Sequence, residues 1–156
     1  MDLRNQLVAI ALKWQEKYGV APAITSTISE YDAAMMLGMK ENEYSEYMKD
    51  KTAVSRGHDF IYNDIKYQIK ARRPSGKPGS KITNAGKAGN YKWDILIWIR
   101  YNVQYEVEEA WAWDRELYIT NFDSQKRISP EDMRKGRELS GHINSHNPQV
   151  EQRAYK

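Results

Sequence analysis

A predicted β-hairpin over residues 57–73 constrains this chain more than any other feature. Two alternating runs, at 58–62 and 65–71, flank Asn63-Asp64, a pair that tolerates the positive φ angles of a two-residue turn. Because side chains alternate between the faces of a strand, one face of the hairpin is apolar. We expect that face to lie in the core, and it carries Phe60, Tyr62, Ile65, Tyr67 and Ile69.

The opposite face of the hairpin carries polar side chains that the turn would bring together. With this turn Tyr62 pairs with Ile65, and Asp59 lies directly opposite Gln68. Lys70 follows on the same face, so a carboxylate, a carboxamide and an amine would be neighbours, and a slip of one residue would separate them. The pattern alone also allows this polar face to be a solvent-exposed surface without a functional role, because antiparallel sheets commonly have one face in solvent.

The spacing of these polar residues resembles the active-site hairpin of the PD-(D/E)xK nuclease superfamily. That superfamily includes restriction enzymes, junction resolvases and some intron-encoded homing endonucleases, in which an acid ends one strand and acid-x-Lys follows on the next. Here the match is Asp59 followed by Gln68-Ile69-Lys70. His58 stands in place of the proline and Gln68 in place of the second acid, and a Gln-x-Lys form occurs in some members. The resemblance covers residues 25–120.

The resemblance implies catalytic roles for Asp59, Gln68 and Lys70 in magnesium-dependent hydrolysis of phosphodiester bonds. Magnesium prefers hard oxygen ligands. The implied ligands are the carboxylate of Asp59, the side-chain oxygen of Gln68 and the backbone carbonyl of Ile69. Lys70 would position or help to deprotonate the attacking water. Because Gln68 carries no charge, we expect weaker metal binding than an acid at this position would give.

A basic segment follows the hairpin. From residue 65 to residue 93 the chain contains no acid, although its formal net charge is only +3. Such a segment is typical of phosphate-backbone binding, and a solvated lysine-rich loop is the alternative. Glycine and proline over 74–90 predict a mobile loop, which lacks the Walker pattern of a P-loop. The expected DNA contacts are Arg72, Arg73, Lys77, Lys81 and Lys87.

Two helices are predicted before the hairpin. The first spans residues 3–18, and its apolar residues recur at helical spacing to form a stripe of Leu3, Leu7, Ile10, Ala11, Trp14 and Tyr18. The second begins near Ser29 and ends at Gly38, and residues 40–55 read as a short helix or an ordered loop. By the resemblance, a further acid from an early helix often completes the site, and the sequence favours neither Glu16 nor Glu30.

After the basic segment the sequence predicts two strands, at 93–100 and 105–113, and a helix from Ser129 to about Leu139. With the hairpin, this order implies a restriction-endonuclease-like α/β fold, in which helices flank a central mixed four-stranded sheet. We expect a single domain over residues 1–156, with a core at about 25–120 and a tail at 141–156.

The composition limits the other possibilities. The chain has no cysteine, which excludes disulfides and zinc–thiolate sites and suits a reducing cytoplasm. It has no apolar run that could span a bilayer and no secretory signal, so we expect a cytoplasmic protein without a membrane partner. His142 and His146 stand four apart, but Gly141 and Pro148 argue against a helix there, and we expect no metal at this pair.

The leading functional hypothesis is a site-specific, magnesium-dependent endonuclease acting on double-stranded DNA, either an intron-encoded homing enzyme or a small restriction-like nuclease. The chain has no separate recognition domain, so a symmetric homo-oligomer, a dimer or a tetramer, is expected to read the duplex. One alternative is a catalytically inactive nucleic-acid-binding module of the same fold. Another is a domain whose aromatic surface binds protein partners, because the chain has five tryptophans and eleven tyrosines.

Overall fold

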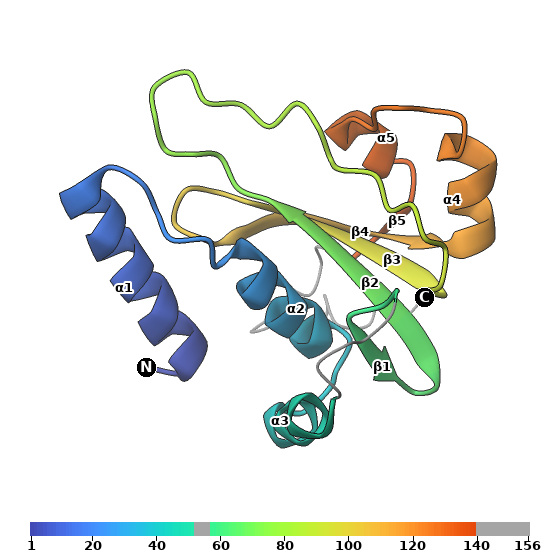
Figure 1. The fold of residues 1–156 in the computed structure, drawn as a ribbon, viewed down its shortest axis with the longest axis horizontal. Helices are drawn as coiled ribbons and strands as arrows, with labels where there is room; N and C mark the ends of the chain where they lie inside the picture. The colour runs from blue at the N-terminus through green and yellow to red at the C-terminus, as the bar shows by residue number, and fades with distance from the viewer. Residues whose placement is uncertain (52–56, 140–156) are drawn as a thin grey trace.

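A computed structural model describes residues 1–51 and 57–139. They form an α/β structure in which helices flank a mixed sheet of strand order β1-β2-β3-β4-β5 (Figure 1). The strands are β1 (Phe60–Tyr62), β2 (Ile65–Arg72), β3 (Ile95–Tyr101), β4 (Val107–Asp114) and β5 (Arg137–Glu138). The helices are α1 (Leu3–Tyr18), α2 (Thr25–Met36), α3 (Glu41–Asp50), α4 (Arg115–Phe122) and α5 (Pro130–Met133).

The predicted hairpin is present with the predicted register over Phe60–Tyr62, whereas His58 and Asp59 lie outside the paired strand. Asn63 and Asp64 take the left-handed φ values of 51° and 63°, and Tyr62 pairs with Ile65 across the turn. The short strand β1 ends this antiparallel ladder at Phe60, whereas β2 continues to Arg72. On its other side β2 pairs in parallel with β3, and the remaining neighbours are antiparallel.

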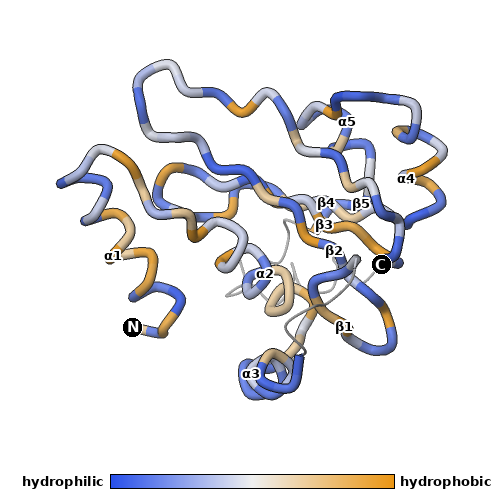
Figure 2. Tube along the Cα trace, in the orientation of Figure 1, coloured by the Kyte–Doolittle hydropathy of each residue, from blue (hydrophilic) through white to orange (hydrophobic). Residues whose placement is uncertain are grey.

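Both faces of the sheet are covered. One face, with Tyr67 and Ile97, packs against α1 and α2, and the other, with Trp98 and Trp113, packs against residues 82–93, α4 and α5. β3 is buried on both faces, which explains its almost continuous apolar sequence. Figure 2 shows apolar residues along β2 and β3 at the centre of the molecule. No helix within residues 1–51 or 57–139 is long and apolar enough to cross a membrane.

The prediction of four strands is wrong, because the chain adds a fifth where a helix to Leu139 was expected. Ser129 does cap a helix, through a capping box with Asp132, but α5 ends at Met133. Gly136 then passes so close to β4 that a Cβ there would lie 2.7 Å from the carbonyl oxygen of Ala112. This close approach lets Arg137 and Glu138 pair with β4 as β5.

Two helical predictions also need correction. α2 begins at Thr25 and not near Ser29, whose buried hydroxyl donates to the carbonyl of Ser26 inside the helix (2.9 Å). α1 has the predicted bounds and ends at Gly19 with φ 85°. However, its apolar stripe does not face the core as a whole. Val8 and Ala11 are buried, whereas Leu3, Ile10, Trp14 and Tyr18 are exposed.

The loop that connects β2 to β3 is anchored in its second half, contrary to the expectation of a mobile segment. The N–H of Ala85 donates to the carbonyl of Ile128 (2.7 Å), and its carbonyl accepts from the indole of Trp98 (3.1 Å). The N–H of Ala88 donates to the hydroxyl of Tyr118 (3.0 Å). Residues 85–88 are therefore held against the sheet.

Candidate functional site

A polar cavity of about 370 Å³ opens where β2 extends beyond the end of β1. α2 contributes one wall of this cavity, β2 the floor, and residues 85–87 of the β2–β3 loop the opposite wall. Sequence segments that lie far apart therefore meet at the open edge of β2. The cavity is lined by Ser26, Ser29, Glu30, Asp59, Gln68, Ile69, Lys70, Ala71, Arg72, Ala85, Gly86 and Lys87.

Asp59 is fixed at this edge by the backbone of β2. Its N–H donates to the carbonyl of Tyr67 (2.8 Å), and its carboxylate accepts from the N–H of Ile69 (2.7 Å). The ammonium group of Lys51, directly after α3, donates to the carbonyl of Asp59 (2.6 Å). In a strand the N–H and C=O of one residue point to the same side, so the Ile69 carbonyl also faces the open edge.

Gln68 and Lys70 line the same cavity as Asp59. The two side chains lie on one face of β2 because they are two residues apart, and both are half-buried. The structure thus brings together the three residues for which the sequence predicts catalytic roles. Those roles themselves remain predictions.

Glu30 adds a second carboxyl group to the cavity from α2. Burial raises its pKa to about 7, and the neighbouring Asp59 carboxylate contributes to the rise, whereas the positive charge of Lys51 opposes it. Glu16, the other candidate, is exposed on α1 and does not line the cavity. Of the two acids that the sequence left open, only Glu30 joins the predicted site.

The donor set of the cavity fits a hard divalent cation. Glu30 and Asp59 supply carboxylates, and Gln68 and Ile69 can supply neutral carbonyl oxygens, which is the ligand chemistry that magnesium prefers. Burial and, to a lesser extent, the nearby Asp59 carboxylate disfavour the charged form of Glu30 and raise its pKa. The described part of the chain contains no cluster of three or more His, Cys, Asp or Glu side chains that could hold a metal, so a cation in this cavity would also need the neutral oxygens of Gln68 and Ile69. His142 and His146 lie outside the described residues.

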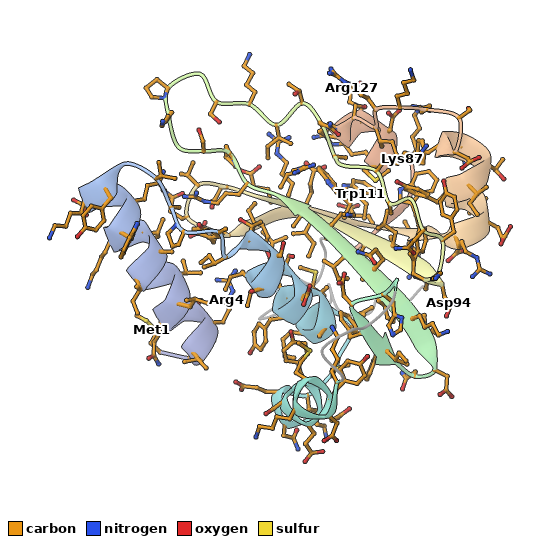
Figure 3. All side chains as sticks on the ribbon, viewed as in Figure 1. Met1, Arg4, Lys87, Asp94, Trp111 and Arg127 are labelled. Atoms are coloured by element: carbon orange, nitrogen blue, oxygen red, sulfur yellow. The ribbon has the colours of Figure 1, made fainter. Side chains whose placement is uncertain are left out.

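Two basic side chains, Arg72 and Lys87, also line the cavity. The guanidinium of Arg72 donates to the carbonyl of Asn84 (3.1 Å) and lies against Gly86, where an added Cβ would come within 2.8 Å of it. Gly86 also has a φ of 86°, which favours glycine. Lys87 is on the side of the sheet covered by α4 and α5 (Figure 3), and its ammonium donates to the carbonyls of Asp123 (2.6 Å) and Gln125 (2.9 Å).

The other predicted DNA contacts divide into two groups. Lys77 and Lys81 are exposed on the first half of the β2–β3 loop. Arg73 points elsewhere, because its guanidinium donates to the carbonyl of Val103 (2.9 Å) and to the side chain of Gln15 (2.8 Å). It also lies 4.1 Å from the ring centroid of Tyr105. These contacts give Arg73 a structural role that joins the loop to α1.

No protein-family model matches this chain, and no curated protein matches it. Its function must therefore be inferred from the chemistry and geometry of the cavity.

Proposed function

We propose that this protein is a magnesium-dependent endonuclease that hydrolyses phosphodiester bonds in double-stranded DNA at specific sites, as a homing or restriction-like enzyme of the restriction-endonuclease-like fold. One observation carries the proposal. Glu30 and Asp59, which come from distant parts of the sequence, share a polar cavity with Gln68 and Lys70. Two acids and a neutral oxygen ligand can hold a divalent cation, and a lysine beside them can orient a water and offset charge, which suits metal-dependent phosphodiester hydrolysis.

Glu30, Asp59, the side-chain oxygen of Gln68 and the backbone carbonyl of Ile69 would hold the magnesium ion. When bound, magnesium supplies Lewis acidity to a phosphoryl oxygen and lowers the pKa of a bound water. The hydrogen bond from the Ile69 N–H fixes the Asp59 carboxylate before the ion arrives (2.7 Å). Because this acid is already ordered, little side-chain entropy is lost on binding.

Lys70 would act on the attacking water. Its side chain lines the cavity on the same strand face as Gln68, where the ammonium group can orient a water by hydrogen bonding. Its positive charge also offsets negative charge that develops on the phosphoryl oxygens. Arg72 lines the adjoining wall, and its planar guanidinium suits a phosphate of the DNA backbone.

The inactive nucleic-acid-binding module is the less favoured alternative. It rests on Gln68, which lacks the negative charge of the second acid in the motif, and on His58, which replaces the proline. Glu30 brings a carboxyl group to the same cavity from α2, so the site still contains two acids. The structure thus supports the enzyme more strongly than the hairpin alone.

Cleavage of supercoiled plasmid in magnesium, with EDTA as a blank, tests the proposal. Lys70→Ala should lower the cleavage rate by about 100-fold or more, as expected for the loss of a cation that orients the water and offsets transition-state charge, and should leave DNA binding in a gel-shift assay intact. Lys66→Ala is the matched control, because Lys66 lies on the same face of β2 but outside the cavity and is exposed.

The other outcomes separate the alternatives. Salt-dependent DNA binding without cleavage in magnesium or manganese would identify an inactive binding module. If the protein neither binds nor cleaves DNA, nucleic acid is not its partner, and protein contacts become the favoured function. Equal loss of activity in Lys66→Ala and Lys70→Ala would contradict the role given to the cavity.

A further inference from the structure

Helix α1 presents an apolar face that nothing in the described residues covers. Leu3, Ile10, Trp14 and Tyr18 recur at helical spacing and remain 75%, 62%, 52% and 58% exposed. Trp14 and Tyr18 pack against each other, with ring centroids 4.7 Å apart, and form a single aromatic projection near the end of the helix. Figure 2 shows α1 at the periphery of the molecule. A contiguous exposed apolar stripe of this kind usually marks an interaction surface.

Polar contacts hold α1 in place and leave this stripe pointing outward. Arg4 lies between α1 and α2 (Figure 3), and its guanidinium donates to the carboxylate of Asp32 (2.8 Å) and to the carbonyl of Tyr105 (2.6 Å). At the other end of the helix, the side chain of Gln15 donates to the carbonyl of Ser75 (2.6 Å). Because α1 is fixed at both ends, its exposed stripe is a defined surface.

An apolar groove lies next to the first turns of the stripe. It has a volume of about 430 Å³ and is formed where α1, α2 and α3 meet. Its apolar and aromatic walls come from Leu3, Leu7, Ile28, Tyr31, Tyr44 and Met48. One helix thus carries an aromatic projection at its C-terminal end and one wall of a groove at its N-terminal end.

We propose that this surface joins two copies of the chain through antiparallel pairing of their α1 helices. In that arrangement Ile10 lies near the two-fold axis, and Trp14 and Tyr18 of each copy reach the groove beside Leu3 and Leu7 of the other. A two-fold interface requires a self-complementary patch, in which residue i meets residue j and j meets i. The projection and the groove at opposite ends of one helix satisfy that requirement.

The charges favour this antiparallel direction. The C-terminal half of α1 carries Lys13 and Lys17 beside the stripe. α3, which lies against the groove, is acidic and contributes Glu41 and Lys49 to the groove wall, where Arg4 is already paired with Asp32. Antiparallel pairing brings Lys17 of one copy toward Glu41 of the other, and it also opposes the two helix dipoles.

The size of the surface is adequate for a dimer. With side-chain areas of about 150–250 Å² for aromatic residues, the four exposed residues leave on the order of 500 Å² of apolar surface on α1. The groove residues other than Leu3 add to this area and bring the total toward the roughly 800 Å² per partner of a standard protein interface. The proposal does not depend on the endonuclease activity, so either can fail while the other stands.

Sedimentation equilibrium of the full chain tests the proposal. The wild type should sediment at twice the 18.3 kDa of the single chain, and Trp14→Glu should sediment as a monomer with an unchanged circular dichroism spectrum. Leu117→Glu is the matched control, because Leu117 is 56% exposed on α4, away from α1. That variant should keep the mass of the wild type.

Cysteine cross-linking tests the direction of pairing, and the absence of native cysteine makes it unambiguous. Ile10→Cys should form a disulfide-linked dimer on oxidation. Leu3→Cys should not, because two Leu3 positions in an antiparallel pair lie about 20 Å apart at 1.5 Å rise per residue. A monomeric wild type, a dimer that Trp14→Glu leaves intact, or a cross-link at Leu3 only would overturn the proposal. A monomer that binds phosphatidylglycerol vesicles through this face would assign it to lipid instead.

Discussion

The carboxyl groups of Glu30 and Asp59 meet at the open edge of β2. Glu30 comes from α2, and Asp59 immediately precedes β1, where the N–H of Ile69 holds its carboxylate. Burial of Glu30 and the negative charge of Asp59 together raise the pKa of Glu30 to about 7. A buried carboxyl group with a raised pKa beside a second carboxylate is typical of a site that binds a cation or transfers protons.

Without metal, this pair should make the protein less stable as the pH rises. The ordinary pKa of Glu30 is 4.5 and its folded value is about 7, so between these values the folded state binds more protons than the unfolded state. The free energy of unfolding therefore falls across this range. In Glu30→Gln the fall should be smaller. Urea denaturation in EDTA from pH 4.5 to 8 measures the difference.

Glu16→Gln is the control for that experiment, because Glu16 is exposed on α1. Its stability should follow the pH dependence of the wild type. Parallel curves for the wild type and Glu30→Gln would show that Glu30 titrates normally and is not part of a carboxyl pair.

The exposed lysines of the β2–β3 loop should contact phosphates. Each phosphate contact contributes about 0.9 to the slope of log affinity against log salt, so replacing both Lys77 and Lys81 with alanine should reduce the slope by about 2. Fluorescence anisotropy with a labelled duplex from 50 to about 300 mM salt measures it. Lys40→Ala, at an exposed position before α3, should leave the slope unchanged. An unchanged slope in the double variant would remove the loop from the interface.

Arg73 should affect stability and not DNA binding. Arg73→Ala removes charged hydrogen bonds to Val103 and Gln15 and the stacking on Tyr105, and should lower the free energy of unfolding by about 2–3 kcal/mol. Arg73→Lys should recover only part of this loss, because an ammonium cannot reproduce the planar stacking. Urea denaturation gives the values. If Arg73→Ala instead keeps normal stability and has a smaller slope of log DNA affinity against log salt, Arg73 contacts DNA.

The hairpin could be predicted from sequence because its determinants are local. Asn63-Asp64 fixes the turn, the turn fixes the register, and the register places Asp59 beside the strand that carries Gln68 and Lys70. The resemblance to a nuclease motif uses the same local spacing. Glu30 and Lys51 were not assigned to the site, because their positions depend on how α2 and α3 pack against the hairpin.

The errors have the same cause. Ser129 correctly marks the start of α5, but the helix stops after one turn because Gly136 meets β4, a contact between segments distant in sequence. The periodicity of α1 correctly predicts a helix. It does not specify which apolar residues are buried, and the structure buries Val8 and Ala11 while it leaves Trp14 exposed.

Calorimetric titration of magnesium into the DNA-free protein tests most directly whether these residues form an ion site. The wild type should bind magnesium, Asp59→Asn should weaken binding by about tenfold or more, and Gln68→Glu should strengthen it by adding a negative charge. Glu16→Gln should bind as the wild type does. Wild-type affinity in Asp59→Asn, or no effect of Gln68→Glu, would contradict a magnesium site at the edge of β2.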